Sequence, residues 1–223
     1  MLLCYITDRR AFGEGEDHRR RALLRRVVEA AAAGVDYIQL REKDLSTRDL
    51  EALAKDVISV VRSNTQRACL LINERTDVAL ASGADGVHLP GKSLPASEVR
   101  SVWMRRADRA PVIGVSAHSV DEVRYAEAHG ADFALLGPIF EKPNTGLCGL
   151  GVDQLSIARQ CAQVPENTEA APQHSFAVLA LGGVNLQNAA QCLRSGASGL
   201  AGIRLFQEGD VYATIRALRG IEA

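Results

Sequence analysis

The segment Val178–Phe206 decides the fold, and it reads VLALGGVNLQNAAQCLRSGASGLAGIRLF. It predicts an apolar strand, a turn at two glycines, and a short helix with Asn185 as its candidate N-cap. The helix is expected to stop at Gly196, and a second apolar strand then opens onto Gly202. The segment therefore reads as two β-strands joined through one helix.

Two turns in this segment carry little side chain, Gly182-Gly183 and Gly202-Ile203. Glycine lets main-chain N–H groups approach an anion, and a helix N-terminus adds partial positive charge. In a parallel β/α barrel, phosphate usually binds in the loops after the last two strands. We expect these four residues to bind phosphate; the simple alternative is that Gly182 and Gly183 only turn the chain.

The same alternation of apolar and amphipathic segments runs along the whole chain. Strands are predicted at Leu2–Ile6, Tyr37–Leu40, Cys69–Ile72, Gly86–Leu89, Val112–Val115, Phe133–Leu136, Ala177–Leu181 and Gly199–Ile203. Helices are predicted near His18–Ala33, Thr47–Ser63, Arg75–Ser82, Ala96–Met104, Val120–His129, Val152–Ala162, Leu186–Ser195 and Val211–Arg219. Eight such pairs predict one α/β domain over residues 1–223, a (β/α)8 TIM barrel. The alternative, an open doubly wound sheet, lacks its Gly-x-Gly-x-x-Gly after the first strand.

A short motif recurs before every second strand and supports the barrel. It reads Gly34-Val-Asp, Gly83-Ala-Asp, Gly130-Ala-Asp and Gly196-Ala-Ser. Glycine is expected to end the helix in a left-handed conformation, and the polar residue to turn the chain into the strand. The last spacing is longer because a polar stretch at Val164–Ser175 reads as a surface insertion. A doublet repeated four times fits an eightfold barrel.

Composition narrows the class of protein. The formal net charge of −1 lacks the basic excess of nucleic-acid-binding domains. The arginines between Arg9 and Arg26 alternate with acidic residues, which indicates a solvated helix face. No apolar run reaches the length of a membrane span or signal peptide, and the five cysteines have no paired spacing. We expect a reduced, cytoplasmic protein without nucleic-acid or membrane partners.

Polar residues follow the second strand, where a barrel carries its chemistry. Gln39, Arg41 and Lys43 are spaced by two and are expected to point to one side. Two cations beside a phosphate site suit a second anionic group, such as a diphosphate or a carboxylate. The alternative is that Arg41 pairs on the surface with Glu42 or Asp44.

Three further strands end in candidate site residues. Asn73 and Glu74 suit either a magnesium ion or a helix N-cap, and the sequence leaves both readings open. His88 lies within a strand and is interpreted as structural, whereas Ser116 and His118 are placed to orient a substrate. There is no histidine cluster for a metal and no serine nucleophile motif.

Several motifs, in order along nearly the whole chain, resemble the thiamine phosphate synthase/TenI superfamily. They are Tyr5-Ile-Thr-Asp, Gln39-Leu-Arg-Glu-Lys, Leu71-Ile-Asn-Glu, Gly83-Ala-Asp-Gly-Val-His-Leu, Gly114-Val-Ser-Ala-His-Ser, Gly130-Ala-Asp-Phe, Gly137-Pro-Ile-Phe, Leu181-Gly-Gly-Val and Gly196-Ala-Ser-Gly. The resemblance implies a barrel that binds a small-molecule thiazole phosphate in thiamin biosynthesis, usually as a homodimer.

Within that superfamily, the synthase joins a pyrimidine methyl diphosphate to the thiazole phosphate with Mg²⁺. The sequence departs from the synthase pattern in three places. Its Asn-Asp pair is Asn73-Glu74 here, and its second metal-binding aspartate falls on Ser93. Its diphosphate clamp after the sixth strand falls on a stretch where Lys142 and Thr145 are the available substitutes. If the synthase reading holds, Glu74 is the metal ligand.

TenI-type proteins instead move a proton on the thiazole carboxylate phosphate, and they need no cofactor. His88-Leu-Pro-Gly-Lys-Ser-Leu resembles that branch, but its proton-transfer base aligns with Pro138. His118, Glu141 and Lys43 are therefore the catalytic candidates, with Lys43 and Arg41 facing the carboxylate. The sequence favours a TenI-type tautomerase; the alternatives are the synthase and a non-catalytic thiazole phosphate binder.

Overall fold

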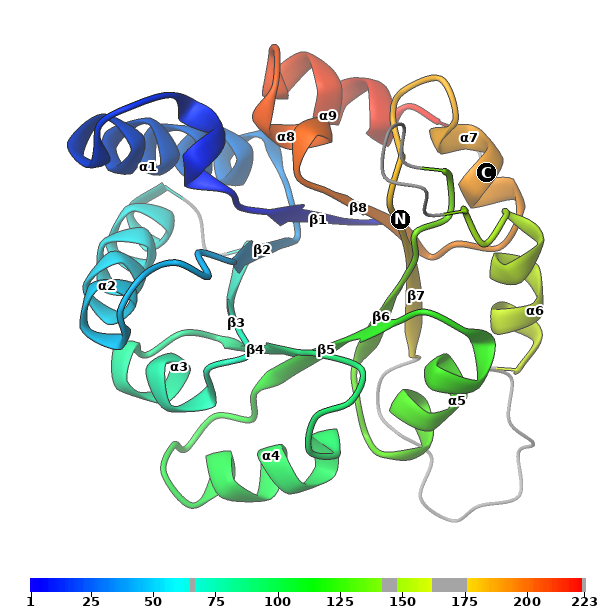
Figure 1. Cartoon of the computed structure of the whole chain (residues 1–223), viewed down its shortest axis with the longest axis horizontal. Coiled ribbons are helices and arrows are strands. Elements are labelled where there is room, and N and C mark those ends of the chain that lie inside the picture. Colours follow the sequence, from blue (N-terminus) through cyan, green and yellow to red (C-terminus); the bar gives the residue numbers. More distant parts are fainter. Residues whose placement is uncertain (65–66, 142–147, 162–175, 222–223) are drawn as a thin grey trace.

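The computed structural model describes residues 1–64, 67–141, 148–161 and 176–221, and it is a closed barrel of eight parallel strands. The strands follow one another in chain order, and β8 pairs with β1 to close the ring (Figure 1). Their bounds are β1 Leu2–Ile6, β2 Tyr37–Leu40, β3 Cys69–Asn73, β4 Gly86–Leu89, β5 Val112–Ala117, β6 Phe133–Leu136, β7 Ala177–Leu181 and β8 Gly199–Gly202. The predicted (β/α)8 fold is confirmed.

Helices cover the outside of the barrel (Figure 1). They are α1 Glu16–Ala33, α2 Thr47–Asn64, α3 Thr76–Ser82, α4 Ala96–Met104, α5 Val120–Ala128, α6 Asp153–Cys161, α7 Ala189–Arg194 and α9 Val211–Arg219. Two four-residue helices were not predicted, η1 Arg9–Phe12 after β1 and α8 Arg204–Gln207 after β8. Each is too short to show a helical period in the sequence.

The helix after β7 begins later than predicted. Its first residue is Ala189 and its N-cap position is Asn188, whose side chain makes no capping bond. Asn185 instead caps the preceding turn, because its Oδ1 accepts bonds from the backbone N–H groups of Gln187 and Asn188. The expectation that Asn185 is the N-cap of the helix itself is therefore wrong by one turn.

Strand residues alternate between two apolar layers. Cys4 and Ile6 of β1 belong to a cluster with Leu71, Phe133, Leu135, Ala177, Leu179 and Ala201. Leu3 and Tyr5 of the same strand pack with buried residues of the surrounding helices. Alternating side chains of a strand point to opposite faces. The first cluster therefore fills the interior of the barrel, and the second packs the helices against its outer face.

The repeated glycine motif closes the amino end of the barrel. The four glycines have positive φ angles, of 100° at Gly34, 75° at Gly83, 81° at Gly130 and 102° at Gly196. The polar residue two positions later accepts a hydrogen bond from the preceding strand: Asp36 from Leu3 N at 2.7 Å, Asp85 from Leu70 N at 2.8 Å, Asp132 from Ile113 N at 2.6 Å and Ser198 from Val178 N at 3.4 Å. Each motif thus ties a pair of consecutive strands together at that end.

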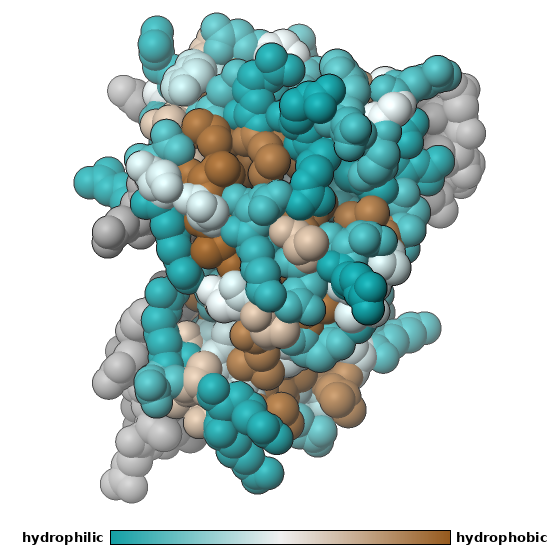
Figure 2. Space-filling view, turned by 90° about the vertical axis from the view of Figure 1, so that its left-hand side faces the viewer, coloured by the Kyte–Doolittle hydropathy of each residue, from teal (hydrophilic) through white to brown (hydrophobic). Residues whose placement is uncertain are grey.

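The basic N-terminal region differs in part from its prediction. Arg21 and Arg25 are exposed, as a solvated face requires, and the side of the molecule formed by α1, α2 and α3 is largely hydrophilic with apolar patches between (Figure 2). Arg9 is different: it is 3% exposed and pairs with Glu16, Glu42 and Asp44. Among the described residues, no helix has the length and apolar character to cross a membrane.

Candidate functional site

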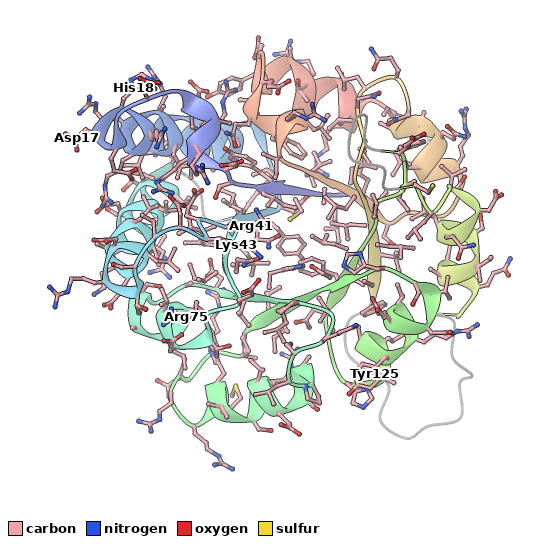
Figure 3. All side chains as sticks on the ribbon, viewed as in Figure 1. Asp17, His18, Arg41, Lys43, Arg75 and Tyr125 are labelled. Atoms are coloured by element: carbon pink, nitrogen blue, oxygen red, sulfur yellow. The ribbon has the colours of Figure 1, made fainter. Side chains whose placement is uncertain are left out.

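A cavity of about 970 Å³ lies at the carboxyl ends of the strands. It contains every predicted site residue except Glu141, and the eight strand ends or the loops that follow them all contribute to it: Gln39, Arg41, Lys43, Asn73, Glu74, Ser116, His118, Gly182, Gly183, Gly202 and Ile203. Arg41 and Lys43 lie beside β2, inside the circle of helices, whereas Arg75 and Tyr125 lie among the outer helices (Figure 3). This is the face on which β/α barrels carry their active sites.

Gln39 carries an unsatisfied oxygen at the edge of the cavity floor. Its side-chain Nε2 donates to Asn73 Oδ1 at 2.7 Å, which uses the amide oxygen of Asn73. Gln39 Oε1 is buried and has no hydrogen-bond partner within the described chain. A buried acceptor without a partner costs free energy, so this oxygen is set up to accept a bond from a ligand.

Arg41, Lys43 and Glu74 form the charged wall of the cavity. Lys43 Nζ lies 3.2 Å from Glu74 Oε1, and Glu74 has a positive φ of 64°, an uncommon conformation for a residue with a side chain. Partial burial acts to raise the pKa of Glu74, but bonds from Lys43 and Asn73 outweigh it and hold the pKa below its usual value. Glu74 is therefore a carboxylate at neutral pH.

Arg41 does not pair with Glu42 or Asp44 on the surface, because both of those carboxylates bind Arg9. Within the described chain, Arg41 makes no ion pair and faces the cavity. A half-buried guanidinium without a carboxylate partner is suited to an anionic ligand. Arg41 and Lys43 together supply two positive charges on one wall.

His88 of β4 lines the same cavity. Its Nε2 is 2.9 Å from Ser116 Oγ, and its buried Nδ1 has no partner among the described residues. Burial, and then the charge of Arg41, lowers the pKa of His88 to about 3. The ring is therefore neutral at physiological pH. Its burial and its contact with Ser116 fit the structural interpretation, but the unpartnered Nδ1 and the position of His88 in the cavity lining do not.

His118 presents a free ring nitrogen to the cavity. Its Nδ1 lies 2.6 Å from the carbonyl oxygen of Gly137. A carbonyl only accepts hydrogen bonds, so Nδ1 carries a proton, and in the neutral form of the ring the lone pair is on Nε2. Among the described residues no hydrogen bond engages Nε2. His118 therefore has the form of a base.

Glu141 is exposed and is not among the described residues that line the cavity. Ser93 is also exposed and outside the cavity, and its hydroxyl donates to the carbonyl of Leu94. Lys142 and Thr145 lie outside the described residues. The structure thus separates Glu141 from the other catalytic candidates.

The glycine turns after β7 and β8 line a different part of the cavity from the charged residues after β2 and β3. Gly182 and Gly183 have φ angles of 91° and 72°. An added Cβ would lie 2.6 Å from Pro138 at the first position and 2.7 Å from Phe140 at the second. Backbone conformation and packing each explain glycine here, and the same bare turns line the cavity beside Gly202 and Ile203.

Several further residues line the cavity, and of these Leu205 and Glu208 were not predicted from the sequence. Arg204, Leu205 and Glu208 lie in or directly after α8, the short helix that was not predicted. Pro90 and Gly91 come from the loop after β4. Arg204 lies two residues beyond β8, and the sequence left open whether it reaches the phosphate or points outward; the structure places it in the cavity lining.

Few side chains among the described residues of the cavity could bind a metal ion. The described residues contain no group of three or more His, Cys, Asp or Glu side chains that would enclose an ion. Mg²⁺ is commonly held by one or two carboxylates together with substrate phosphates. Glu74 therefore fits a magnesium ion that binds together with a diphosphate, and it does not fit a site made by protein alone.

Comparisons with known proteins agree on one family. The profile of the thiamine monophosphate synthase family matches residues 3–206. A protein of Aquifex aeolicus, provisionally named a second thiamine-phosphate synthase, is 38% identical over 204 residues, covering 91% of this chain and 96% of the relative. The thiamine-phosphate synthase of Roseiflexus sp. is 35% identical over 225 residues, covering 100% and 85%.

A solved structure gives the same result. Thiamine phosphate pyrophosphorylase from Pyrococcus furiosus superposes with a TM-score of 0.76 at 30% identity, over 99% of this chain and 94% of that one. Sequence and structure thus match over nearly the full length. The chain belongs to the thiamine phosphate synthase/TenI family of thiamin-biosynthesis enzymes.

Proposed function

We propose that this protein acts as a thiamine phosphate synthase, which joins hydroxymethylpyrimidine diphosphate to hydroxyethylthiazole phosphate. The relatives that span nearly the whole chain are named thiamine-phosphate synthases, so the comparisons favour this activity over the tautomerase that single positions suggested. The observation that carries the proposal is that one cavity of about 970 Å³ is lined by the cationic side chains of Arg41 and Lys43 and, separately, by the glycine turns after β7 and β8. Two substrates, each with its own phosphate group, need two such sets of residues.

Each substrate has residues that suit it. The backbone N–H groups at Gly182, Gly183, Gly202 and Ile203 would bind the thiazole phosphate. Arg41 and Lys43 would bind the diphosphate through charge-assisted hydrogen bonds. Gln39 Oε1, the buried acceptor without a partner, would accept a bond from an amino group on the pyrimidine.

The reaction breaks the bond between the pyrimidine methylene carbon and the diphosphate oxygen, and the electron pair leaves with the diphosphate. The thiazole nitrogen then donates its lone pair to that carbon, which forms the new C–N bond. Arg41 and Lys43 stabilise the charge that develops on the leaving diphosphate. Mg²⁺, when bound through Glu74 and the diphosphate, would neutralise part of that charge.

A neutral His88 supports this chemistry. A positive charge beneath the developing pyrimidine methyl cation would oppose its formation. Burial keeps the ring of His88 uncharged near neutral pH, so it adds a hydrogen-bonding surface without a cationic one.

One observation favours the tautomerase as a second candidate. His118 Nε2 carries a lone pair at the cavity wall, which suits proton abstraction from a thiazole carboxylate phosphate. This reaction needs no metal, which suits a site with few carboxylates. Arg41 and Lys43 would then face the substrate carboxylate.

The deciding experiment is an endpoint assay with pyrimidine methyl diphosphate, thiazole phosphate and Mg²⁺, in which thiamine phosphate is measured. We expect product that disappears on chelation, and a roughly 10- to 100-fold loss of kcat/KM in Lys43→Ala. Lys55→Ala is the matched control, because Lys55 pairs with Glu51 on the outer helix α2. Absence of product, with proton exchange on the thiazole carboxylate phosphate that is lost in His118→Asn, would establish the tautomerase instead.

If neither activity is detected, the remaining candidate is a non-catalytic protein that binds thiazole phosphate. In that case thiazole phosphate should raise the melting temperature while no substrate turns over. The homodimer implied by the family resemblance stays a prediction, which light scattering of the purified protein would test.

A further inference from the structure

Arg9 is a buried cation that the chemistry above does not use. It follows β1, lies at the start of η1 and is 3% exposed. Its guanidinium contacts three carboxylates: Nε lies 2.7 Å from Glu16, and Nη1 lies 3.2 Å from Glu42 and 2.7 Å from Asp44. Arg9 does not line the cavity, so its function has to be exerted through its partners.

Two of those partners alternate with the cavity cations. The segment after β2 reads Arg41-Glu-Lys-Asp44, and its side chains divide between two sides. Arg41 and Lys43 line the cavity, whereas Glu42 and Asp44 bind Arg9. The direction in which the two cations point is therefore coupled to the contacts behind them.

Backbone contacts hold the same segment. Thr7 Oγ1 donates to Glu42 at 2.5 Å and accepts from the backbone N–H of Arg41 at 3.0 Å. The backbone N–H of Arg9 donates to Glu42 at 3.0 Å. Glu42 is thus anchored by both residues, and Asp44 is anchored by the Arg9 guanidinium, which lowers the pKa of Asp44.

We propose that Arg9 is a positioning residue that holds Arg41 and Lys43 in the geometry needed to bind the anionic group of the substrate. The identity of that group as a diphosphate rests on the function proposed above. Stability is a weak explanation for this arrangement, since a buried ion pair seldom adds net stability. Arg9 also favours anion binding through its charge. It offsets the negative charges of Glu42 and Asp44, which would otherwise repel the anionic group of the substrate.

The test is a double-mutant cycle on the binding of inorganic pyrophosphate, measured by calorimetry with the full chain. We expect Arg9→Met and Lys43→Ala each to weaken binding about tenfold. If Arg9 acts by positioning Arg41 and Lys43, the double variant should bind pyrophosphate little worse than either single variant. Independent effects, about a hundredfold in the double variant, would overturn the positioning role.

Two further variants keep the test informative if Arg9→Met folds poorly. Asp44 is 42% exposed, so Asp44→Asn is expected to fold and to release one side of the guanidinium. Loss of its negative charge alone would strengthen anion binding, so a fall of about threefold in pyrophosphate affinity is the result expected from loss of positioning. Arg9→Lys, which keeps the charge, should recover part of the affinity. Unchanged affinity in both Arg9→Met and Asp44→Asn would overturn the inference.

The control is Arg100→Met. Arg100 pairs with Asp132 at 2.9 Å at the opposite end of the barrel, so its loss should lower the melting temperature and leave pyrophosphate affinity unchanged. A fall in affinity equal to that of Arg9→Met would show that general destabilisation is the cause and would refute positioning. The two proposals can fail separately. If the Arg9/Lys43 cycle gives the expected result but the endpoint assay yields no thiamine phosphate, the synthase activity is refuted and the role of Arg9 stands.

Discussion

Acid should destabilise this protein through His88 in particular. The ring is 1% exposed, and burial followed by the charge of Arg41 lowers its pKa from 6.5 to about 3. Below pH 6.5 the unfolded chain therefore takes up a proton on this residue that the folded protein does not. The free energy of unfolding must fall as the pH falls from 6.5 towards 3, and the contribution is fully present above pH 6.5.

The size of the effect follows from the two pKa values. Each pH unit between them costs about 1.4 kcal/mol, so the loss at pH 5 is about 2 kcal/mol. That is a large share of a total stability of roughly 5–15 kcal/mol. The assay is urea unfolding of the wild type and of His88→Gln, which cannot take up the proton, at pH 8 and at pH 5.

The stability advantage of the wild type over His88→Gln should shrink by about 2 kcal/mol between those two pH values. His18→Gln is the control, because His18 is exposed on α1 (Figure 3), and it should follow the wild-type pH dependence. An advantage that stays constant from pH 8 to pH 5 would refute the neutral buried ring.

Three other predictions concern the turn, the metal and the amino end. Gly182→Ala should cost about 2–4 kcal/mol in urea unfolding, because φ is 91° and the new Cβ would lie 2.6 Å from Pro138; a cost below about 1 kcal/mol would show that the turn relaxes. Glu74→Gln should raise the Mg²⁺ concentration for half-maximal synthase activity about tenfold, and an unchanged requirement would remove Glu74 as the ligand. Asp132→Asn weakens the bonds from Ile113 N and Arg100, so it should cost about 1–2 kcal/mol of stability with KM unchanged; a shift in KM would contradict the separation of the two ends.

The sequence predicted the barrel well because the relevant information is local. Apolar runs, amphipathic segments and the glycine motifs each specify an element within a few residues, and most strand bounds agree to within one or two positions. The burial of Arg9 could not be predicted in this way. Of its three carboxylate partners, Glu16 begins α1, whereas Glu42 and Asp44 follow β2. The contacts with Glu42 and Asp44 therefore form only once β1 and β2 are paired. In the sequence alone, arginine among acidic residues is the pattern of a solvated surface.

The sequence predicted which strand-end residues line the cavity, and the roles of those residues stay predictions. Residues just after strands converge in any barrel, which is why Gln39, Lys43, Asn73 and His118 were found. Glu141 follows β6 at a greater distance, and the path of a loop after its first residues is set by tertiary contacts that the strand-end rule does not contain. The preference for a tautomerase rested on a few altered positions, whereas the named relatives match over nearly the whole chain.

The glycine-and-aspartate motifs at the amino end have an evolutionary consequence. Asp36, Asp85 and Asp132 tie strands together at the end of the barrel opposite the cavity, and each is also paired with an arginine. Substitutions among the cavity side chains therefore leave these ties intact. Side chains at the mouth can therefore change with the reaction while the hydrogen bonds and ion pairs at the amino end stay in place.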